Sequence, residues 1–98
     1  MEVSMTSIYR SVKWLAAVRQ IECCVLCNRW GVQAAHRNEG KGTGFKVDDS
    51  LTAALCVDCH HTIDNGRELT REERRALMDR AIVLTLRDLT RRGLVVPK

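Results

Sequence analysis

The segments CVLC (residues 24–27) and CVDC (residues 56–59) decide how this chain folds, because each places two cysteines two residues apart. That spacing lets both thiolates of a pair reach one ion from a tight turn. Two such pairs complete a tetrahedral shell, for which Zn²⁺ is the expected ion. We therefore predict a structural zinc site formed by Cys24, Cys27, Cys56 and Cys59.

A fifth cysteine, Cys23, directly precedes the first pair. The two-residue spacing favours Cys24 as the ligand, and we interpret Cys23 as a buried apolar thiol. Two other interpretations use the same cysteines. Disulfides would need an oxidising compartment, and CVDCH (residues 56–60) also matches the c-type haem attachment pattern, which would leave Cys24 and Cys27 without a role.

The size of the chain makes such a site useful for folding. The chain has 98 residues, of which 45% are hydrophobic and only 4% aromatic, which excludes a large aromatic core. Chains this short often need a metal or disulfides for stability. The sequence contains no run of about 18 apolar residues, the length needed to span a membrane. Residues 1–5 lack the pattern of a signal peptide. We therefore expect a cytoplasmic protein with no membrane association, where cysteine pairs more often bind metal.

The charge is uneven along the chain. Residues 1–65 hold seven basic and seven acidic side chains, whereas residues 66–98 hold nine and five, so the net charge of +4 lies in the last third. A basic excess favours a polyanionic partner, although a well-solvated surface has the same composition.

The pattern predicts one α+β domain over residues 1–98, with a core at 22–66 between two helices. Ser7 or Ser11 can cap a first helix at about 8–20, with Ile8, Val12 and Leu15 on one face and Trp14, Val18 and Ile21 beside them. Residues 33–36 and 51–55 are short enough for the strands of a hairpin, and a short helix should cover 57–65.

A longer helix is predicted at about 71–92. Thr70 and Glu73 match a capping box at its start, and Gly93 is a suitable stop. Its apolar seam is expected to consist of Met78, Ile82, Leu86 and Leu89.

Two of the three histidines lie after the cysteine pairs in the sequence, one after each pair. His36 ends the first predicted strand, and His60 directly follows Cys59. If one ion gathers both pairs, the segments that carry these imidazoles become neighbours. An imidazole can bind a divalent metal or accept a proton from water. The alternative is that both are ordinary surface or core residues.

At this point the sequence resembles a family. The ordered set of Cys24–Cys27, Ala35-His36-Arg37, Gly40-Lys41-Gly42-x-Gly44-x-Lys46, Asp49, Cys56–His60 and Ile63-Asp64 is similar to HNH endonucleases. Among these it looks most like the small prophage-encoded nuclease-domain proteins of the YbcO type. The resemblance covers residues 13–66, about half of the chain.

The resemblance implies a ββα-metal core within a treble-clef-like zinc scaffold, and metal-dependent hydrolysis of DNA phosphodiester bonds. It assigns the activation of water to His36 and the catalytic Mg²⁺ or Mn²⁺ to His60. Asp49, rather than Ser50, fits the middle position and could orient His36 or contribute to the metal site. Many members carry an acidic metal ligand where this chain has Ala35.

Metal binding would then rest on His60 and a further group. Asp64 lies four residues beyond His60, on the same face of a helix, although a capping or ion-pair role is an equal alternative. His61 would point about 100° away. Phosphate-backbone contacts are expected from basic residues of the glycine-rich loop and the last helix, namely Arg37, Lys41, Lys46, Arg80, Arg87 and Arg91.

Three functions compete at this stage. The first is a metal-dependent DNA endonuclease, whose substrate could be recombination or branched DNA. The second is a zinc-ribbon-like nucleic-acid-binding module without catalysis, and the third a zinc-stabilised protein-interaction domain. Cutting both strands of a junction would need two copies, and the seam of the last helix could supply a homodimer interface.

Overall fold

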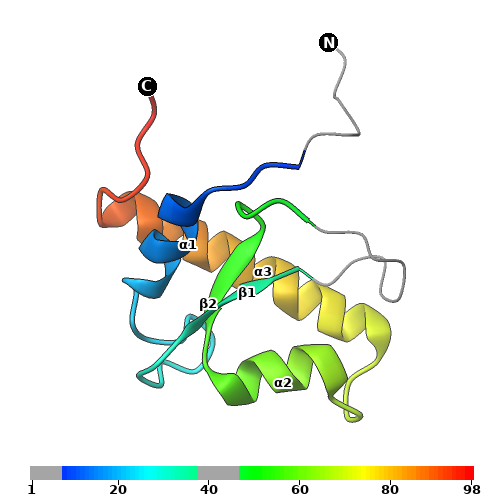
Figure 1. Cartoon of the computed structure of the whole chain (residues 1–98). Helices are drawn as coiled ribbons and strands as arrows, with labels where there is room; N and C mark the ends of the chain where they lie inside the picture. Colours follow the sequence, from blue (N-terminus) through cyan, green and yellow to red (C-terminus); the bar gives the residue numbers. More distant parts are fainter. Residues whose placement is uncertain (1–7, 38–46) are drawn as a thin grey trace.

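The structure, a computed structural model, describes residues 8–37 and 47–98. Its elements are, in chain order, α1 (Val12–Arg19), β1 (Gln33–His36), β2 (Thr52–Leu55), α2 (Val57–Asn65) and α3 (Arg71–Arg91) (Figure 1). The predicted α+β class is confirmed. Among the helices of the described segments, none combines the length and the apolar character that a membrane crossing needs. The glycine-rich loop predicted at Gly40, Gly42 and Gly44 lies outside the described residues.

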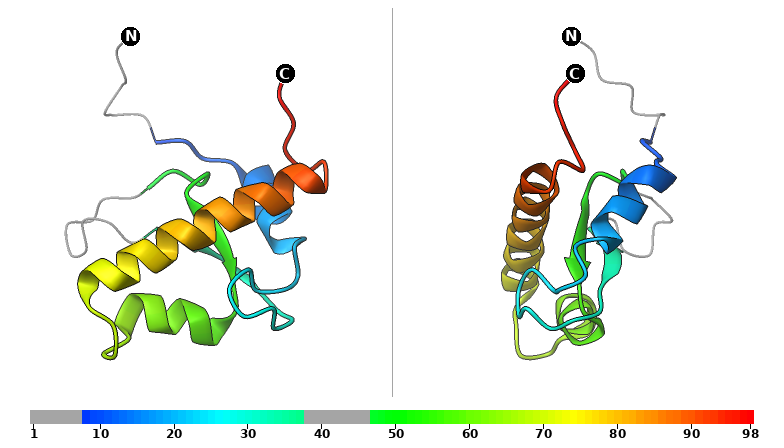
Figure 2. Two further views of the ribbon diagram at one scale, coloured as in Figure 1. Left: turned by 180° about the vertical axis from the view of Figure 1, so that it is seen from behind. Right: turned by 90° about the vertical axis from the view of Figure 1, so that its left-hand side faces the viewer.

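The two strands form an antiparallel hairpin in the middle of the molecule. Gln33 pairs with Leu55 and His36 with Thr52. Both helix α1 and helix α3 contact the hairpin, which lies between them (Figure 2). The strand bounds match the prediction at β1, and β2 begins one residue later than expected, at Thr52.

The core divides into two clusters that follow this layering. One cluster joins β1 and β2 to α2 and the first half of α3, and it consists of Cys24, Ala35, Ala53, Leu55, Cys56, Ile63, Met78 and Ala81. The other joins α1 to β2 and the end of α3, and it consists of Ala17, Val18, Ile21, Ala54 and Leu89. The cysteines of the predicted zinc site therefore border the first cluster.

The predicted apolar face of the first helix is correct at Val18 and Ile21 and wrong at Ile8 and Val12. The helix starts at Val12, whose side chain is 81% exposed, and the buried residues are Ala17, Val18 and Ile21. Ser11 caps the helix, as one of the two predicted caps, and its Oγ accepts the N–H of Trp14 at 3.0 Å. Residues 8–10 are not helical, so the periodicity that includes Ile8 has no helix to support it.

Helix α3 begins and ends as predicted. The Thr70 hydroxyl accepts the N–H of Glu73, and the Glu73 carboxylate accepts the N–H of Thr70, which is the complete capping box. At the other end Gly93 has a φ of +69°, where glycine carries no steric penalty. The N–H of Gly93 donates to the Thr90 carbonyl and that of Leu94 to the Leu89 carbonyl, the Schellman pattern.

The buried face of α3 differs from the predicted seam. Met78 and Leu89 are buried as expected, but Leu86 is 46% exposed, and Ala81 and Thr85 take the buried positions. These small side chains face a hairpin whose own inner residues include alanines, so helix and strands can approach closely. Hydrophobicity alone favours the larger leucine and therefore selects the wrong face.

Thr85 also completes the hydrogen bonding of β2. The N–H of Ala54 donates to Thr85 Oγ1 at 3.0 Å, and the Thr85 hydroxyl donates to the Ala81 carbonyl at 2.8 Å. The N–H of Val25 donates to the Ala54 carbonyl at 3.0 Å. Both backbone groups of Ala54, on the edge of β2 away from β1, are thus paired within the chain.

Candidate functional site

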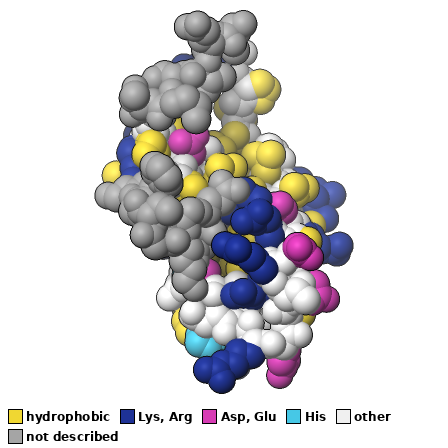
Figure 3. Space-filling view, turned by 90° about the vertical axis from the view of Figure 1, so that its right-hand side faces the viewer, with side chains coloured by type: hydrophobic (Ala, Val, Ile, Leu, Met, Phe, Trp, Pro, Cys, Tyr) yellow, Lys and Arg dark blue, Asp and Glu magenta, His cyan; other side chains and the backbone are white. Residues whose placement is uncertain are grey.

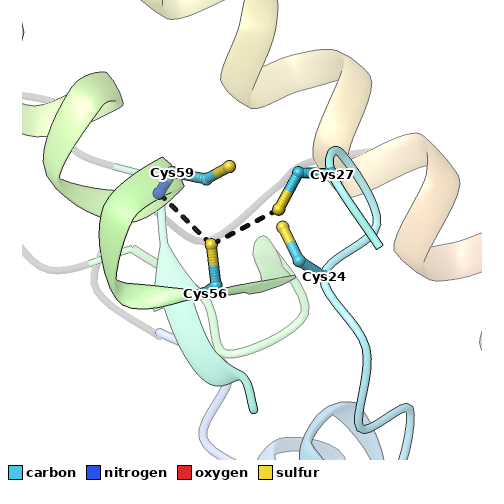
Figure 4. Close-up of side chains that lie close together, drawn as sticks. All are labelled: Cys24, Cys27, Cys56 and Cys59. Carbon is cyan, nitrogen blue, oxygen red and sulfur yellow. Dashed lines mark hydrogen bonds between the residues drawn. The ribbon is translucent and has the colours of Figure 1, made fainter. Parts of the chain in front are cut away.

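Four cysteine side chains gather beside the hairpin. The sulfur atoms of Cys24, Cys27, Cys56 and Cys59 all lie within 4.8 Å of one another. Figure 4 shows that they converge from two segments, the turn before β1 and the first turn of α2. Cys24 and Cys56 are buried, whereas Cys27 is exposed. The two pairs that the spacing predicted are therefore brought together, and the cluster could hold a zinc ion.

The first pair sits on a tight turn closed by backbone hydrogen bonds. The N–H of Cys24 donates to the Arg29 carbonyl and that of Asn28 to the Cys24 carbonyl, both at 2.8 Å. Asn28 has a φ of +65°, a conformation that asparagine tolerates better than most residues. Cys23 pairs with Trp30 through a β-bridge and lies outside the four-cysteine cluster, as the spacing predicted.

The second pair occupies the start of α2. Cys56 is the N-cap, and its Sγ accepts the N–H of Cys59 at 3.4 Å. The Cys27 and Cys56 sulfur atoms are 3.6 Å apart. Both sulfur atoms of this pair therefore lie at the N-terminus of α2, close to the first pair.

The ionisation of the cluster is uneven in the absence of a cation. Burial raises the pKa of the Cys24 thiol, but backbone hydrogen bonds, that of Cys56 foremost, outweigh this effect and lower the pKa to about 7. Burial and then the neighbouring thiols raise the pKa of Cys59. Four sulfur atoms this close cannot all carry charge unless a cation compensates them. This donor set fits the tetrahedral, thiolate-rich shell of Zn²⁺.

His36 lies beside Asp49 on the far side of the same hairpin. His36 Nε2 is 2.8 Å from Asp49 Oδ1, and Asp49 is only 3% exposed. The other carboxylate oxygen accepts the N–H of Ser11 at 2.7 Å, and Arg10 donates to Oδ1 at 3.2 Å. The His36 imidazole, the Ser11 N–H and the Arg10 guanidinium hold the pKa of the Asp49 carboxyl below its usual range, against the effect of burial.

This contact fixes the proton of the His36 ring. An ionised carboxylate can only accept hydrogen bonds, so His36 Nε2 carries a proton and donates a hydrogen bond to Asp49. In the neutral ring Nδ1 is then the basic nitrogen. The His36 side chain is 36% exposed, so this imidazole is accessible from solvent.

His60 forms a separate pair with Asp64. His60 Nε2 is 3.0 Å from Asp64 Oδ2, one helical turn away on α2 as predicted. On the other side of the ring, His60 Nδ1 is 2.7 Å from Oε1 of Gln33 on β1. With Nδ1–H donating to that amide oxygen, Nε2 and the carboxylate face each other and need a proton or a cation between them.

The structure does not bring the two predicted imidazoles together. His60 contacts Gln33, which lies three positions before His36, about 10 Å along the strand. Gln33 and His36 also alternate in side-chain direction, so they leave opposite faces of the hairpin. Within the described ranges, the four cysteines are the only group of three or more His, Cys, Asp or Glu side chains that could share an ion.

The predicted phosphate-binding residues lie in separate parts of the chain and do not surround either histidine pair. Arg37 forms a two-pronged pair with Asp79 of α3, with Nε 2.7 Å and Nη2 3.3 Å from the carboxylate oxygens. Lys41 and Lys46 lie outside the described residues.

The arginines of α3 share one exposed face, as predicted. Helical spacing places Arg80, Arg87 and Arg91 on the side of α3 opposite its buried residues. Arg87 Nε also lies 3.6 Å from Asp88. These arginines therefore point away from the hairpin and from both histidines. Figure 3 shows a face where Lys and Arg side chains gather with acidic side chains between them.

Three partners in these pairs were not predicted from the sequence. Gln33 holds the His60 ring, and Asp49 is bound by the backbone N–H of Ser11 and the guanidinium of Arg10. No local pattern marks any of them, because each contact joins segments far apart in the chain.

Comparison of the chain with protein-family models, with curated proteins and with solved structures finds no match. The functional argument therefore rests on the geometry described above.

Proposed function

We propose that this protein is a metal-dependent DNA endonuclease of the HNH type, with a zinc-stabilised, treble-clef-like ββα core. The observation that carries the proposal is the contact between His36 Nε2 and the buried carboxylate of Asp49 at 2.8 Å. The order of the parts supports it, because a cysteine turn, the β1–β2 hairpin and α2 with the second cysteine pair follow one another.

In this proposal His36 is the general base. Asp49 holds the ring with Nε2–H donating, which leaves the Nδ1 lone pair to take the proton of a water that attacks the phosphorus. As the new P–O bond forms, the ester P–O bond breaks, and the leaving oxygen takes a proton from solvent. The carboxylate also stabilises the imidazolium that forms, as an aspartate does in other histidine-based sites. Asp49 is thus a positioning residue, itself held by Arg10 and Ser11.

His60 and Asp64 are the proposed ligands for the catalytic divalent ion. Their facing atoms, 3.0 Å apart, match the spacing of adjacent ligands about 2.1 Å from one octahedral ion. Gln33 fixes the ring so that Nε2 is the ligating nitrogen. A bound Mg²⁺ or Mn²⁺ would supply positive charge to the phosphate oxygens. Because His36 and Gln33, which holds His60, leave opposite faces of the hairpin, joint action on one phosphate would need these segments to rearrange on the DNA.

DNA binding is proposed to be led by the phosphate backbone. The net charge of +4 and the arginine face of α3 favour a polyanion. None of the described elements presents a row of side chains suited to reading bases in a groove, so sequence preference is expected to be weak.

The decisive experiment compares two histidine variants in a plasmid-nicking assay with Mg²⁺ or Mn²⁺. His36→Ala should lower the cleavage rate by about 10²- to 10⁴-fold, because it removes the proton acceptor. His61→Ala is the matched control, since His61 is exposed on α2 and takes part in neither pair. Both variants should keep the zinc content and the thermal transition of the parent. Equal cleavage by parent and His36→Ala would refute the proposal.

A second function is favoured by the separation of the two histidine pairs. A zinc-ribbon-like nucleic-acid-binding module would need neither a shared phosphate nor a second ion. It predicts salt-dependent DNA affinity that added Mg²⁺ leaves unchanged, and no cleavage of linear, nicked, branched or single-stranded DNA by the parent protein.

A further inference from the structure

Trp30 is the largest exposed apolar side chain beside the cysteine cluster. It is 75% exposed, and it borders a groove of about 330 Å³. The other residues of this groove are Arg29, Gly31, Val32, Gln33, Cys56 and Val57. Val57 is also 64% exposed, so two large apolar side chains of the lining are open to solvent. This volume falls at the lower end of the range for small-molecule sites.

Backbone pairing holds the segment that carries Trp30 in place. Trp30 is bridged to Cys23, and the N–H of Gly31 donates to the Glu22 carbonyl at 2.7 Å. Gly31 has a φ of +98°, and a Cβ built at this position would meet no atom within 4 Å. The turn that carries the first two cysteines therefore presents the indole on a fixed support, with open space beside it.

The chemistry of the groove suits a flat, polar ring that is joined to an anion. The indole offers a stacking face, and the exposed Gln33 side chain offers hydrogen-bonding groups in the lining. Arg29 pairs with Asp58, but their side chains are 62% and 74% exposed. An ion pair this exposed is weak and can be exchanged for a phosphate.

We propose that this groove binds an unpaired nucleobase of a DNA strand, stacked on Trp30, with Arg29 on the adjoining phosphate. Base stacking on aromatic side chains is the usual means of binding single strands. Gln33 lines the groove and also holds the imidazole of His60. A base in the groove would therefore lead its strand toward the His60–Asp64 pair. The inference rests on the proposed nuclease function and defines its substrate class as DNA with single-stranded segments.

The chain contains a built-in reporter for this proposal. Its only other tryptophan is Trp14, whose indole N–H has no hydrogen-bond partner among residues 8–37 and 47–98, so Trp14→Phe removes no hydrogen bond within these ranges. In this full-length single-tryptophan variant, a thymidine oligonucleotide of about 12 nucleotides should quench the fluorescence of Trp30 in a saturable way. A blunt duplex of the same length should quench it at least about tenfold less strongly at equal concentration.

Binding of the labelled oligonucleotide provides the second measurement. Trp30→Ala should weaken it by about ten- to a hundredfold, the loss expected for one stacked base, and Trp30→Phe should recover most of the affinity. Val83→Ala, which changes an equally exposed apolar residue on α3, should have no effect. Equal binding by the parent and Trp30→Ala, or Trp30 fluorescence unchanged at saturating oligonucleotide, would overturn the proposal. So would self-association of the parent that Trp30→Ala abolishes, which would assign the groove to a protein interface.

The two proposals can fail separately. Quenching of Trp30 in a protein that cleaves no DNA would support the base-binding groove and remove the nuclease function. Cleavage that depends on His36 but shows no preference for single-stranded segments, and no change in Trp30→Ala, would keep the nuclease function and remove the groove.

Discussion

At the scale of single residues, Asp49 connects more of the candidate site than any histidine does. Its carboxylate receives His36, Arg10 and the backbone of Ser11, so it holds the segment before α1 and the proposed base at once. Burial opposes the charge of this carboxylate, but its three partners are donors and outweigh burial, so the ionised form is the stable one in the folded protein. A residue with both tasks affects stability and activity together.

The first prediction concerns the pH dependence of Asp49→Asn. The folded-state pKa of Asp49 lies below the usual value of 3.8, so its stabilising effect is present above about pH 3.8 and is lost as the pH falls through the lower folded value. The parent should therefore be more stable than Asp49→Asn at neutral pH, and the difference should shrink in acid.

Urea unfolding of both proteins across this pH range measures that difference. The zinc-site cysteines are common to both proteins, so their protonation affects the two curves alike. A difference in unfolding free energy that stays constant down to pH 2 would contradict the depressed pKa. Cleavage by Asp49→Asn should also fall, because the amide no longer fixes the His36 tautomer.

Residue-level chemistry was predictable where the partners are close in the chain. The two CxxC pairs and the i, i+4 relation of His60 and Asp64 follow from local spacing alone. The contacts of Arg37 with Asp79 and of Gln33 with His60 join residues 42 and 27 positions apart. Spacing carries no information about such contacts, because only the packing of the elements sets them.

At the scale of elements, capping and turn signals predicted more than hydrophobicity did. The start of α3 at its capping box and its end before Gly93 agree with the sequence because these signals act within one turn. The faces of α1 and α3 were predicted less well. Small residues such as Ala81 and Thr85 line the contact with the hairpin, and their value depends on how closely another element approaches.

Thr85 gives an element-scale prediction with a control on the same helix. Thr85→Val leaves the N–H of Ala54 buried without an acceptor, so we expect a loss of about 1–3 kcal/mol in unfolding free energy. Thr90→Val makes the same change at an exposed site and should stay within about 0.5 kcal/mol of the parent. Chemical denaturation with excess zinc measures the unfolding free energy of both variants. Equal losses in the two variants would show that the hydrogen bond from Ala54 to the Thr85 hydroxyl adds no stability.

At the scale of the whole molecule, the four cysteines join the turn before β1 to the start of α2 across the hairpin. The chain buries few large side chains, and its core is rich in alanine. We therefore expect zinc binding to supply a large part of the folding free energy. The sequence predicted all four members of this cysteine cluster, because each half of the cluster is a local motif.

Cys56→Ser and Cys23→Ser test that link as a matched pair. Cys56→Ser removes a cluster sulfur and the N-cap acceptor of α2, so the variant should lose zinc and its cooperative thermal transition. Cys23→Ser changes a neighbouring thiol outside the cluster and should retain one zinc per chain. Metal content and circular dichroism report both results. A Cys56→Ser protein with the parent's zinc content and melting temperature would exclude the four-cysteine site.

The pairing of Ala54 has a consequence for the behaviour of this protein at high concentration. Its carbonyl and N–H on the outer side of β2 are already taken by Val25 and Thr85. A strand from another molecule finds no open backbone group there to extend the sheet, so intermolecular sheet growth cannot begin at Ala54 while α3 is docked.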